Sequence, residues 1–416
     1  ESCHPAPDGT VASISRDDDR TAASLGGRDG DAWRTLIAWH RTVQPTLLDA
    51  LLRPLPGLWP KLKLLPFDLL RFSNIALRSG QGLARHLFQG EAARRVMPGL
   101  ALHVDQGPED RFGAALGYML ATMAATGGNA VPLGGAQALT NALVRRLEAK
   151  GGRVRLGAKV ERIVVRQRRA QAVVLADGQE IPVGRAVLAN TDAAFLYLKL
   201  LEGQALPGRL TRRMRRFPRG WGTFKVDYAL SAPVPWAVAD ARQAAVVHAG
   251  DSVADLVRFT RQVRSGALPE HPYLVIGQQS LVDRSRAPDG QHTLWVYTRV
   301  PNTVEGGWAA QAEAMADRVD ARLEGLAPGF KATVLARRMV TPPDLEAFDA
   351  NLVGGDLGGG SNAWTNQLVF RPAFPYYRYR TPITGAYLCS SYAHPGAGVH
   401  GMCGFNAAAQ ALRDLG

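Results

Sequence analysis

The chain has 416 residues, of which 46% are hydrophobic and 20% charged. This balance excludes a largely disordered protein and allows two or three domains with large cores. The 49 basic and 36 acidic residues give a net charge of +13, which raises nucleic acid or an anionic membrane as partners. The excess is scattered apart from the run 209–219, and no zinc-finger or RNA-binding signature accompanies it, so we predict no nucleic-acid partner. For that run, a solvated arginine-rich face and a contact with acidic lipid both remain open.

Cysteine usage fits a reducing compartment, because Cys3, Cys389 and Cys403 are too few and too far apart for a disulfide framework. We therefore predict a cytoplasmic protein. The nine histidines form no cluster with metal-ligand spacing, so we predict no metal site. No window of about 20 unbroken apolar residues predicts a membrane span. The chain begins with Glu1 and no secretory signal follows, so we expect a fragment or a processed start.

The N-terminal part is predicted to begin with an extended segment, His4–Ser15, that turns at Asp8-Gly9. From residue 31 to about 78 the pattern is helical, but prolines interrupt it, beginning with Pro45. Residues 47–77 mix Leu, Trp and Phe with Arg and Lys. That mixture is typical of helices that line a core or pocket, and also of an element lying on a membrane surface, so both readings stay open.

The middle of the chain predicts half of a nucleotide-binding fold. A helix over 112–125 and a second over 139–147 precede four predicted strands, at 154–156, 159–165, 172–175 and 185–189. Helix, strand, a small antiparallel meander and a returning strand are the order expected there. The returning strand ends at Asn190, Thr191 and Asp192, where open α/β sheets bind ligands.

The next block has a different pattern, in which apolar and polar residues alternate strictly from Thr223 to Leu230, as in a half-buried strand. Further strands are predicted at 244–247, 273–278 and 293–300, followed by a helix with Trp308 to Leu323 on one face. Strands and then a helix indicate an α+β module with an antiparallel sheet. We expect the glycine-rich segment 354–360 to be a flexible loop.

The C-terminal stretch 385–409 reads as a short strand, a glycine-rich loop and the start of a helix. Gly396, Gly398 and Gly401 spell G-x-G-x-x-G, but a dinucleotide fingerprint must open a βαβ unit of about 30 residues and Gly416 comes too soon. The stretch suits an anion or a polarised ring instead, because glycines allow close backbone approach and a helix start offers free N–H groups.

Several strings together resemble one family: Pro132–Leu139, Gly157–Ile163, Phe224–Leu230, Arg380–Cys389 and His394–Gly401. In this order they resemble the phytoene desaturase-related, FAD-dependent oxidoreductases of the glutathione-reductase-like flavoprotein superfamily. The resemblance implies a discontinuous, Rossmann-like FAD-binding domain of the α/β class, lacking its N-terminal βαβ unit, beside an α+β substrate domain. The implied FAD-binding segments are 1–20, 128–200 and 372–416, and the implied substrate segments are 21–127 and 201–371.

The resemblance also implies FAD as cofactor. It places the backbone of Val160 against the adenine, Asn190 and Thr191 near the dinucleotide, and the loop before the last helix along the ribityl chain and flavin ring. The implied loop residues are Ser390, Ser391, His394, Gly396, Gly398, Val399 and Gly401. The sequence departs from the family in two respects. The G-x-G-x-x-G that opens the family does not occur before Glu1, and Ser390-Ser391 replaces the usual Gly-Asp or Gly-Ala.

His394 and Lys225 are the candidates for proton transfer, with Asp227 as a partner of Lys225. For His394 a structural role in the loop is the alternative, and for Lys225 an ion pair with a carboxylate. We expect an FAD-dependent oxidoreductase acting on a hydrophobic, isoprenoid-like small molecule. A carotenoid desaturase or isomerase, and a non-catalytic binding or regulatory protein with the same fold, are the alternatives. The oligomeric state and peripheral membrane contact stay open.

Overall fold

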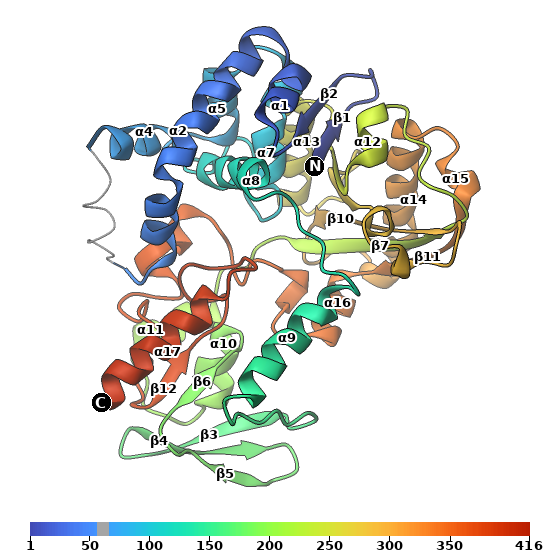
Figure 1. Cartoon of the computed structure of the whole chain (residues 1–416). Helices are drawn as coiled ribbons and strands as arrows, with labels where there is room; N and C mark the ends of the chain where they lie inside the picture. The colour runs from blue at the N-terminus through green and yellow to red at the C-terminus, as the bar shows by residue number, and fades with distance from the viewer. Residues whose placement is uncertain (56–65) are drawn as a thin grey trace. The chain divides into compact units, whose positions relative to one another are not determined.

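The computed structural model describes residues 1–55 and 66–416, and the chain divides into two compact units, each described by itself (Figure 1). Unit 1 comprises Glu1–Gln44, Pro66–Gly151 and Trp221–Leu345, and unit 2 comprises Pro45–Leu65, Gly152–Gly220 and Glu346–Gly416. Of the predicted surface segment 47–77, the part from 56 to 65 lies outside the described residues.

Several segments that the prediction assigned to one domain lie in the unit that holds most of the other. Residues 1–20 and 128–151 lie in unit 1, and 201–220 and 346–371 lie in unit 2. The physical reason for the first is a strand pairing: Ser2 and Cys3 pair in parallel with Val246 and Val247. That partner lies more than 200 residues away, and hydrophobic patterning carries no information about it.

Unit 1 is built on a seven-stranded sheet with the order β11-β7-β10-β9-β8-β1-β2. All neighbours pair antiparallel except β1 with β8, which agrees with the predicted antiparallel substrate module. The strands are β1 Ser2–Pro5, β2 Val11–Ile14, β7 Gly222–Leu230, β8 Val246–Ala249, β9 Leu274–Gly277, β10 His292–Val300 and β11 Val334–Val340. The pairing of β1 and β2 confirms the predicted extended segment and its turn.

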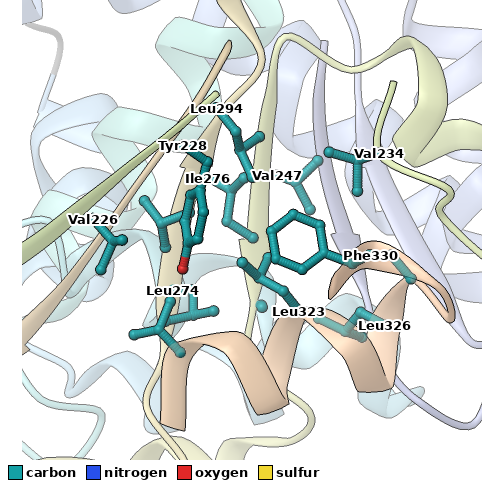
Figure 2. Packing of buried hydrophobic residues seen from close by; sticks show 14 of the residues in the cluster. Val226, Tyr228, Val234, Val247, Leu274, Ile276, Leu294, Leu323, Leu326 and Phe330 are labelled. Carbon is teal, nitrogen blue, oxygen red and sulfur yellow. The ribbon is translucent and has the colours of Figure 1, made fainter. Parts of the chain in front are cut away.

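One face of this sheet forms the main core. The predicted alternation in β7 is confirmed, since Phe224, Val226, Tyr228 and Leu230 are buried and pack with the helices α14 (Trp308–Leu326) and α15 (Phe330–Thr333). Figure 2 shows Leu323, Leu326 and Phe330 turned toward side chains of β7, β9 and β10. In α14 the buried residues follow helical spacing, so one stripe of the helix faces the sheet.

The opposite face is covered in part by α13 (Val253–Arg264), through Leu256, Phe259 and Val263, and by Leu102 at the end of α7 (Val96–Ala101), which pack with Tyr273 and Val275. Besides α7, α13, α14 and α15, the helices of unit 1 are α1 Asp18–Leu25, α2 Gly27–Leu52, α4 Pro66–Ala76, α5 Gly80–Leu87, α6 Glu91–Arg94, α8 Ala114–Thr126, α9 Ala136–Glu148, α12 Ala239–Gln243 and α16 Pro342–Phe348. The last residues of α2 and of α16 belong to unit 2. The expected break at Pro45 was wrong, because α2 continues through that residue.

Unit 2 contains two small sheets and a helical layer. Strands β3 Val160–Arg166, β4 Arg169–Leu175 and β5 Glu180–Pro182 form the predicted meander, whereas β6 Val187–Ala189 pairs in parallel with β12 Ala386–Leu388. The predicted strand at 154–156 was wrong, because those residues are not in a strand. The helices are α10 Ala193–Phe195, a π-helix Leu196–Leu200, α11 Gly208–Arg215 and α17 Met402–Leu415, with short 3₁₀ turns between 353 and 370.

The core of unit 2 joins the meander, the parallel pair and the helices through Ile163, Leu196, Ala386, Leu388 and Tyr392. Besides this pair, an isolated parallel bridge joins Arg169 and Thr384. The mixed helix and sheet architecture is therefore established, while the discontinuous Rossmann-like domain without its N-terminal βαβ unit stays a prediction. Over the described residues, no helix combines the length and apolarity needed to cross a membrane.

Candidate functional site

The carboxyl ends of β6 and β12 bring four of the predicted cofactor residues together in unit 2. Leu388 is the register partner of Ala189, and the Cys389 amide donates to the Ala189 carbonyl at 3.0 Å. Asn190 and Thr191 therefore follow one strand, and Ser390 and Ser391 follow the other, at the same edge. The Ser390 hydroxyl donates to the Thr191 carbonyl at 2.7 Å, and this hydrogen bond links the two strand ends.

The glycine-rich loop leads directly into α17. Gly396, Gly398 and Gly401 have φ values of 105°, 149° and 67°, in the region that favours glycine. No side chain caps the helix at Gly401, although His400 Nδ1 accepts from the Met402 amide at 3.0 Å. A Cβ at Gly401 would meet nothing within 4 Å. A 14-residue helix thus begins at an open backbone position, with the positive end of its dipole toward that position.

The side chain of Arg371 anchors this loop, and Arg371 is only 2% exposed. Its Nη2 donates to the carbonyls of Gly358, Gly359 and Ser391 at 2.7, 2.8 and 2.8 Å, and its Nε also donates to Ser391 at 3.1 Å. A Cβ at Gly396 would lie 3.3 Å from the guanidinium, so the absence of a side chain there allows the close approach. Arg371 therefore fixes two loops to each other.

Asp356 orders the segment that was expected to be flexible. Its carboxylate accepts from the amides of Gly220 and Gly358 at 2.7 Å each and from Gly360 at 2.9 Å. The flexible-loop expectation for 354–360 was wrong, because one buried carboxylate satisfies three backbone donors of glycine residues. The glycine-rich composition alone predicts a mobile loop there. The acceptor that orders the loop, the carboxylate of Asp356, lies within the glycine run itself.

His394 is buried at 5% exposure, and its Nε2 lies 3.1 Å from the Arg53 carbonyl oxygen. Its own carbonyl accepts from the Tyr379 hydroxyl at 2.9 Å. Both contacts tie the loop to other parts of unit 2, which supports the structural alternative. A catalytic role for His394 stays a prediction.

Arg219 belongs to a polar cluster that sequence reasoning missed. It pairs with the buried Asp192, and its Nη1 also donates to the Tyr392 hydroxyl at 3.0 Å. Tyr392 in turn donates to the Asn351 carbonyl at 2.7 Å. Burial and the charge of Asp192 raise the pKa of Tyr392, so its phenol stays protonated. Only part of the run 209–219 is a solvated face, since Arg209, Arg212, Arg215 and Arg216 are exposed but Arg219 is not.

In unit 1, Lys225 and Asp227 lie on the face of the sheet opposite the main core. Their register partners on β10 are Tyr297 and Trp295, so the four side chains share one face. Lys225 Nζ bonds both carboxylate oxygens of Asp227. The predicted partnership is therefore confirmed as an ion pair, and a proton-transfer role for Lys225 stays a prediction.

A cavity of about 310 Å³ opens beside this face. Trp295 lines it together with Ala245, Val246 and Gly277 of the sheet region and with residues 129–132, 135 and 136. Trp295 fills the space above Gly277, where a Cβ would lie 2.0 Å from the indole. Part of the string Pro132–Leu139 thus forms a wall of this cavity, and its lining is largely apolar.

Comparison with known proteins decides the family. Residues 29–402 match the family model described as flavin containing amine oxidoreductase, which is most of the chain. The chain belongs to the flavin-containing amine oxidoreductase family. FAD is therefore the cofactor that both the sequence resemblance and the family imply.

Curated relatives in this oxidoreductase family include pyridine nucleotide-disulfide oxidoreductase domain-containing protein 2 of Mus musculus, 33% identical over 296 residues. That match covers 68% of this chain and 51% of the relative. Phytoene desaturase (neurosporene-forming) of Rhodobacter capsulatus is 26% identical over 371 residues, covering 85% of this chain and 65% of the relative. The chain spans about half the length of the first of these relatives.

Solved structures agree on the fold. An oxidoreductase from Methanosarcina mazei matches with a TM-score of 0.59 at 15% identity, covering 98% of this chain and 80% of the other. Putrescine oxidase bound to putrescine matches with a TM-score of 0.54 at 15% identity, covering 99% of this chain and 80% of the other. At that identity the likeness carries the fold alone.

The residues of unit 2 fit the flavin end of a family site. An uncapped helix start with an open position at Gly401 offers backbone donors to an electron-rich ring edge or ribityl oxygen. Asn190, Thr191 and Ser391 lie at the neighbouring strand ends, and open α/β sheets bind ligands at the carboxyl ends of their strands. Val160 opens β3, and its register partner is Leu175. Val399 is 95% exposed, so its side chain is free for contact with a ligand.

Proposed function

We propose that this family member is an FAD-dependent oxidoreductase of the dehydrogenase or desaturase type, acting on a hydrophobic, isoprenoid-like substrate. The observation that carries the proposal is the family match over 29–402, joined by several phytoene desaturases among the relatives. A bound flavin supplies the hydride acceptance that side chains cannot provide. The chain's residues then have to hold the ring, exclude water and manage the accompanying proton.

In this proposal, the start of α17 holds the flavin edge. The amides of Cys403 and Gly404 would donate to the ring, since that of Met402 is engaged with His400, and the helix dipole would favour negative charge there. Arg371 and Asp356 support this position by fixing the loops around it. The Ser390 hydroxyl donates to the Thr191 carbonyl and accepts from the Tyr392 amide at 3.4 Å, so it would hold the strand end in place beside the cofactor.

We place the substrate against the cavity of unit 1. Its lining is apolar at Val131, Pro132, Val246 and Trp295, and its polar members include Gln279 and Arg286. An apolar wall with a positive charge suits a hydrocarbon better than a cationic amine. Lys225 and Asp227 form an ion pair on the same face of the sheet. The Lys225 Nζ is the predicted atom for holding a proton on this face.

The test uses the full natural polypeptide that contains this chain. We expect a flavin absorbance band in the purified protein, and bleaching of that band under anaerobic conditions with a phytoene-like polyene in liposomes. Lys225→Met should slow the bleaching without releasing flavin, whereas Lys331→Met, at an exposed position, should not. A protein that binds no flavin after reconstitution would favour the non-catalytic alternative. Flavin binding without bleaching by any polyene would remove the isoprenoid substrate and the carotenoid desaturase alternative.

We also propose peripheral membrane contact through α4. Phe67 is 83% exposed and Leu70 66% exposed, and Arg71 is exposed beside them. Apolar and basic residues on one short helix are the arrangement expected of an interfacial element. In a flotation assay with anionic vesicles, the double variant F67D/L70D should lose binding and Phe348→Asp should not, since Phe348 is equally exposed, at 89%, on another helix. Equal flotation of all three proteins would refute the contact.

A further inference from the structure

Five side chains in unit 1 form a continuous hydrogen-bonded chain that the proposed site does not use. The Tyr297 hydroxyl lies 2.8 Å from His103 Nδ1, and His103 Nε2 lies 2.9 Å from His248 Nε2. His248 Nδ1 lies 3.0 Å from the Ser2 hydroxyl, which lies 3.2 Å from His4 Nε2. These residues come from β10, β8, β1 and the segment after α7. Four contacts thus connect positions spread over nearly 300 residues of sequence.

All four hydrogen bonds can be donated in the same direction along these five side chains. Tyr297 donates to His103, which donates from Nε2 to His248, which donates from Nδ1 to Ser2, which donates to His4. Every ring nitrogen in this order has a consistent role, with one N–H and one acceptor on each of His103 and His248. Reversing all four bonds gives a second consistent arrangement. Two end states that differ only in hydrogen positions are what proton transfer along a chain requires.

The surroundings keep the imidazoles neutral. Ser2, His4 and His248 are each at most 2% exposed. His4 stacks on His248 at 4.7 Å. Burial lowers the pKa of His103 to about 4, with Arg299 contributing, and burial with Arg95 and His103 lowers the pKa of His4 to about 3. A neutral imidazole has one N–H and one lone pair, which is the form that accepts a proton at one nitrogen and releases another.

One end of the chain, Tyr297, contacts a residue that lines the proposed substrate cavity. Tyr297 stacks on Trp295, with ring centroids 5.8 Å apart and an interplanar angle of 12°, and Trp295 lines the 310 Å³ cavity. The other end is His4, in the edge hairpin of the sheet. The guanidinium of Arg95 bonds the His4 carbonyl at 2.8 Å and fixes this hairpin.

We propose that Tyr297, His103, His248, Ser2 and His4 form a proton relay between the cavity face of the sheet and its edge. In one passage, the hydrogens of Tyr297, His103, His248 and Ser2 each move to the next acceptor. Four O–H or N–H bonds break and four form. The net change is one proton lost by the Tyr297 oxygen and one gained at His4 Nε2. In the same passage, water accepts the proton that His4 releases from Nδ1, and the substrate or another water reprotonates the Tyr297 oxygen, so that all five groups end neutral.

The use of the relay by substrate rests on the proposed function, since a dehydrogenation releases a proton together with the hydride. The existence of the relay does not depend on flavin or substrate. It is therefore tested on the protein alone, and a failed test leaves the proposed function standing.

The experiment measures exchange of the imidazole N–H of His103 with water, by NMR on protein labelled with ¹⁵N-histidine. His248→Gln keeps one donor and one acceptor but cannot pass a proton. We expect it to slow the His103 exchange by about tenfold, whereas a purely structural network would exchange through local opening and speed up or stay unchanged. His271→Gln is the matched control, because His271 is exposed.

Ser2→Ala provides a second measurement that holds even if His248→Gln fails to fold. It removes the link between His248 and His4 and leaves the His103–His248 contact in place. The relay predicts slower exchange at His103, although Ser2 does not touch that residue. An unchanged or faster exchange at His103 in Ser2→Ala would overturn the proposal.

Discussion

Replacing Arg371 by methionine tests how the candidate flavin loop is held. The substitution keeps the length of the buried side chain and removes every donor to the carbonyls of Gly358, Gly359 and Ser391. A hydrogen bond to a charged group contributes about 1.5–3 kcal/mol, so three acceptors set an upper range of roughly 4–9 kcal/mol. Water that enters the site recovers part of this, and we expect a loss of about 3–5 kcal/mol, because each buried carbonyl left without a donor costs about 1–3 kcal/mol.

The loss should be local to unit 2. Hydrogen exchange by mass spectrometry should show faster exchange in peptides covering 356–360 and 390–398, and little change in the seven-stranded sheet. Arg371→Lys keeps the charge without the planar fork, so we expect an intermediate effect. Arg209→Met is the control, because Arg209 is exposed on α11. Equal exchange in Arg371→Met and the unaltered protein would refute the role assigned to this guanidinium.

Two further predictions concern unit 1. Because burial holds the pKa of His103 and of His4 well below the ordinary value of 6.5, the unfolded chain binds more protons below that pH. The free energy of unfolding should therefore fall as pH drops from about 6.5 toward 4, by about 1.4 kcal/mol per pH unit for each such histidine. Urea unfolding at pH 7.5 and 5 should show a smaller loss in His103→Gln, and an equal loss would contradict the argument. Gly277→Ala would place a Cβ 2.0 Å from the Trp295 indole, so the ring must move, and near-ultraviolet circular dichroism should change. Gly325→Ala, which meets nothing within 4 Å, should leave that spectrum unaltered.

Local patterning predicted the elements whose burial alternates or repeats along the chain. The strand β7 and the stripe of α14 are examples, since each packs one face on the same core. The two strands β6 and β12 were predicted from their residue patterns, but their pairing was not predicted and is shown by the register. The pairing brings Asn190, Thr191, Ser390 and Ser391 to one edge, and their ligand-binding roles stay predictions.

The predictions that were wrong share one physical cause: the structure of each segment depends on residues that are distant in the sequence. The first strand joins unit 1 because β8 accepts it, and Asp356 orders a glycine run through the amide of Gly220 as well as through its own neighbours. The hydrogen-bonded histidines were seen only as residues without metal-ligand spacing. Their contacts depend on how four separate segments meet, which spacing in sequence does not express.

The order of the large sheet has a consequence for how the chain comes to be folded. The hairpin of β1 and β2 is synthesised long before the strand that it must join, β8, which ends at Ala249. At about 5–20 residues per second, the ribosome needs roughly 12–50 s to deliver that partner. During this time Cys3, on the face of the hairpin that joins the main core, lacks the strands and helices of that core. This hairpin is therefore open to misassociation until β8 is made, and a chaperone that binds short extended apolar segments would act at that stage.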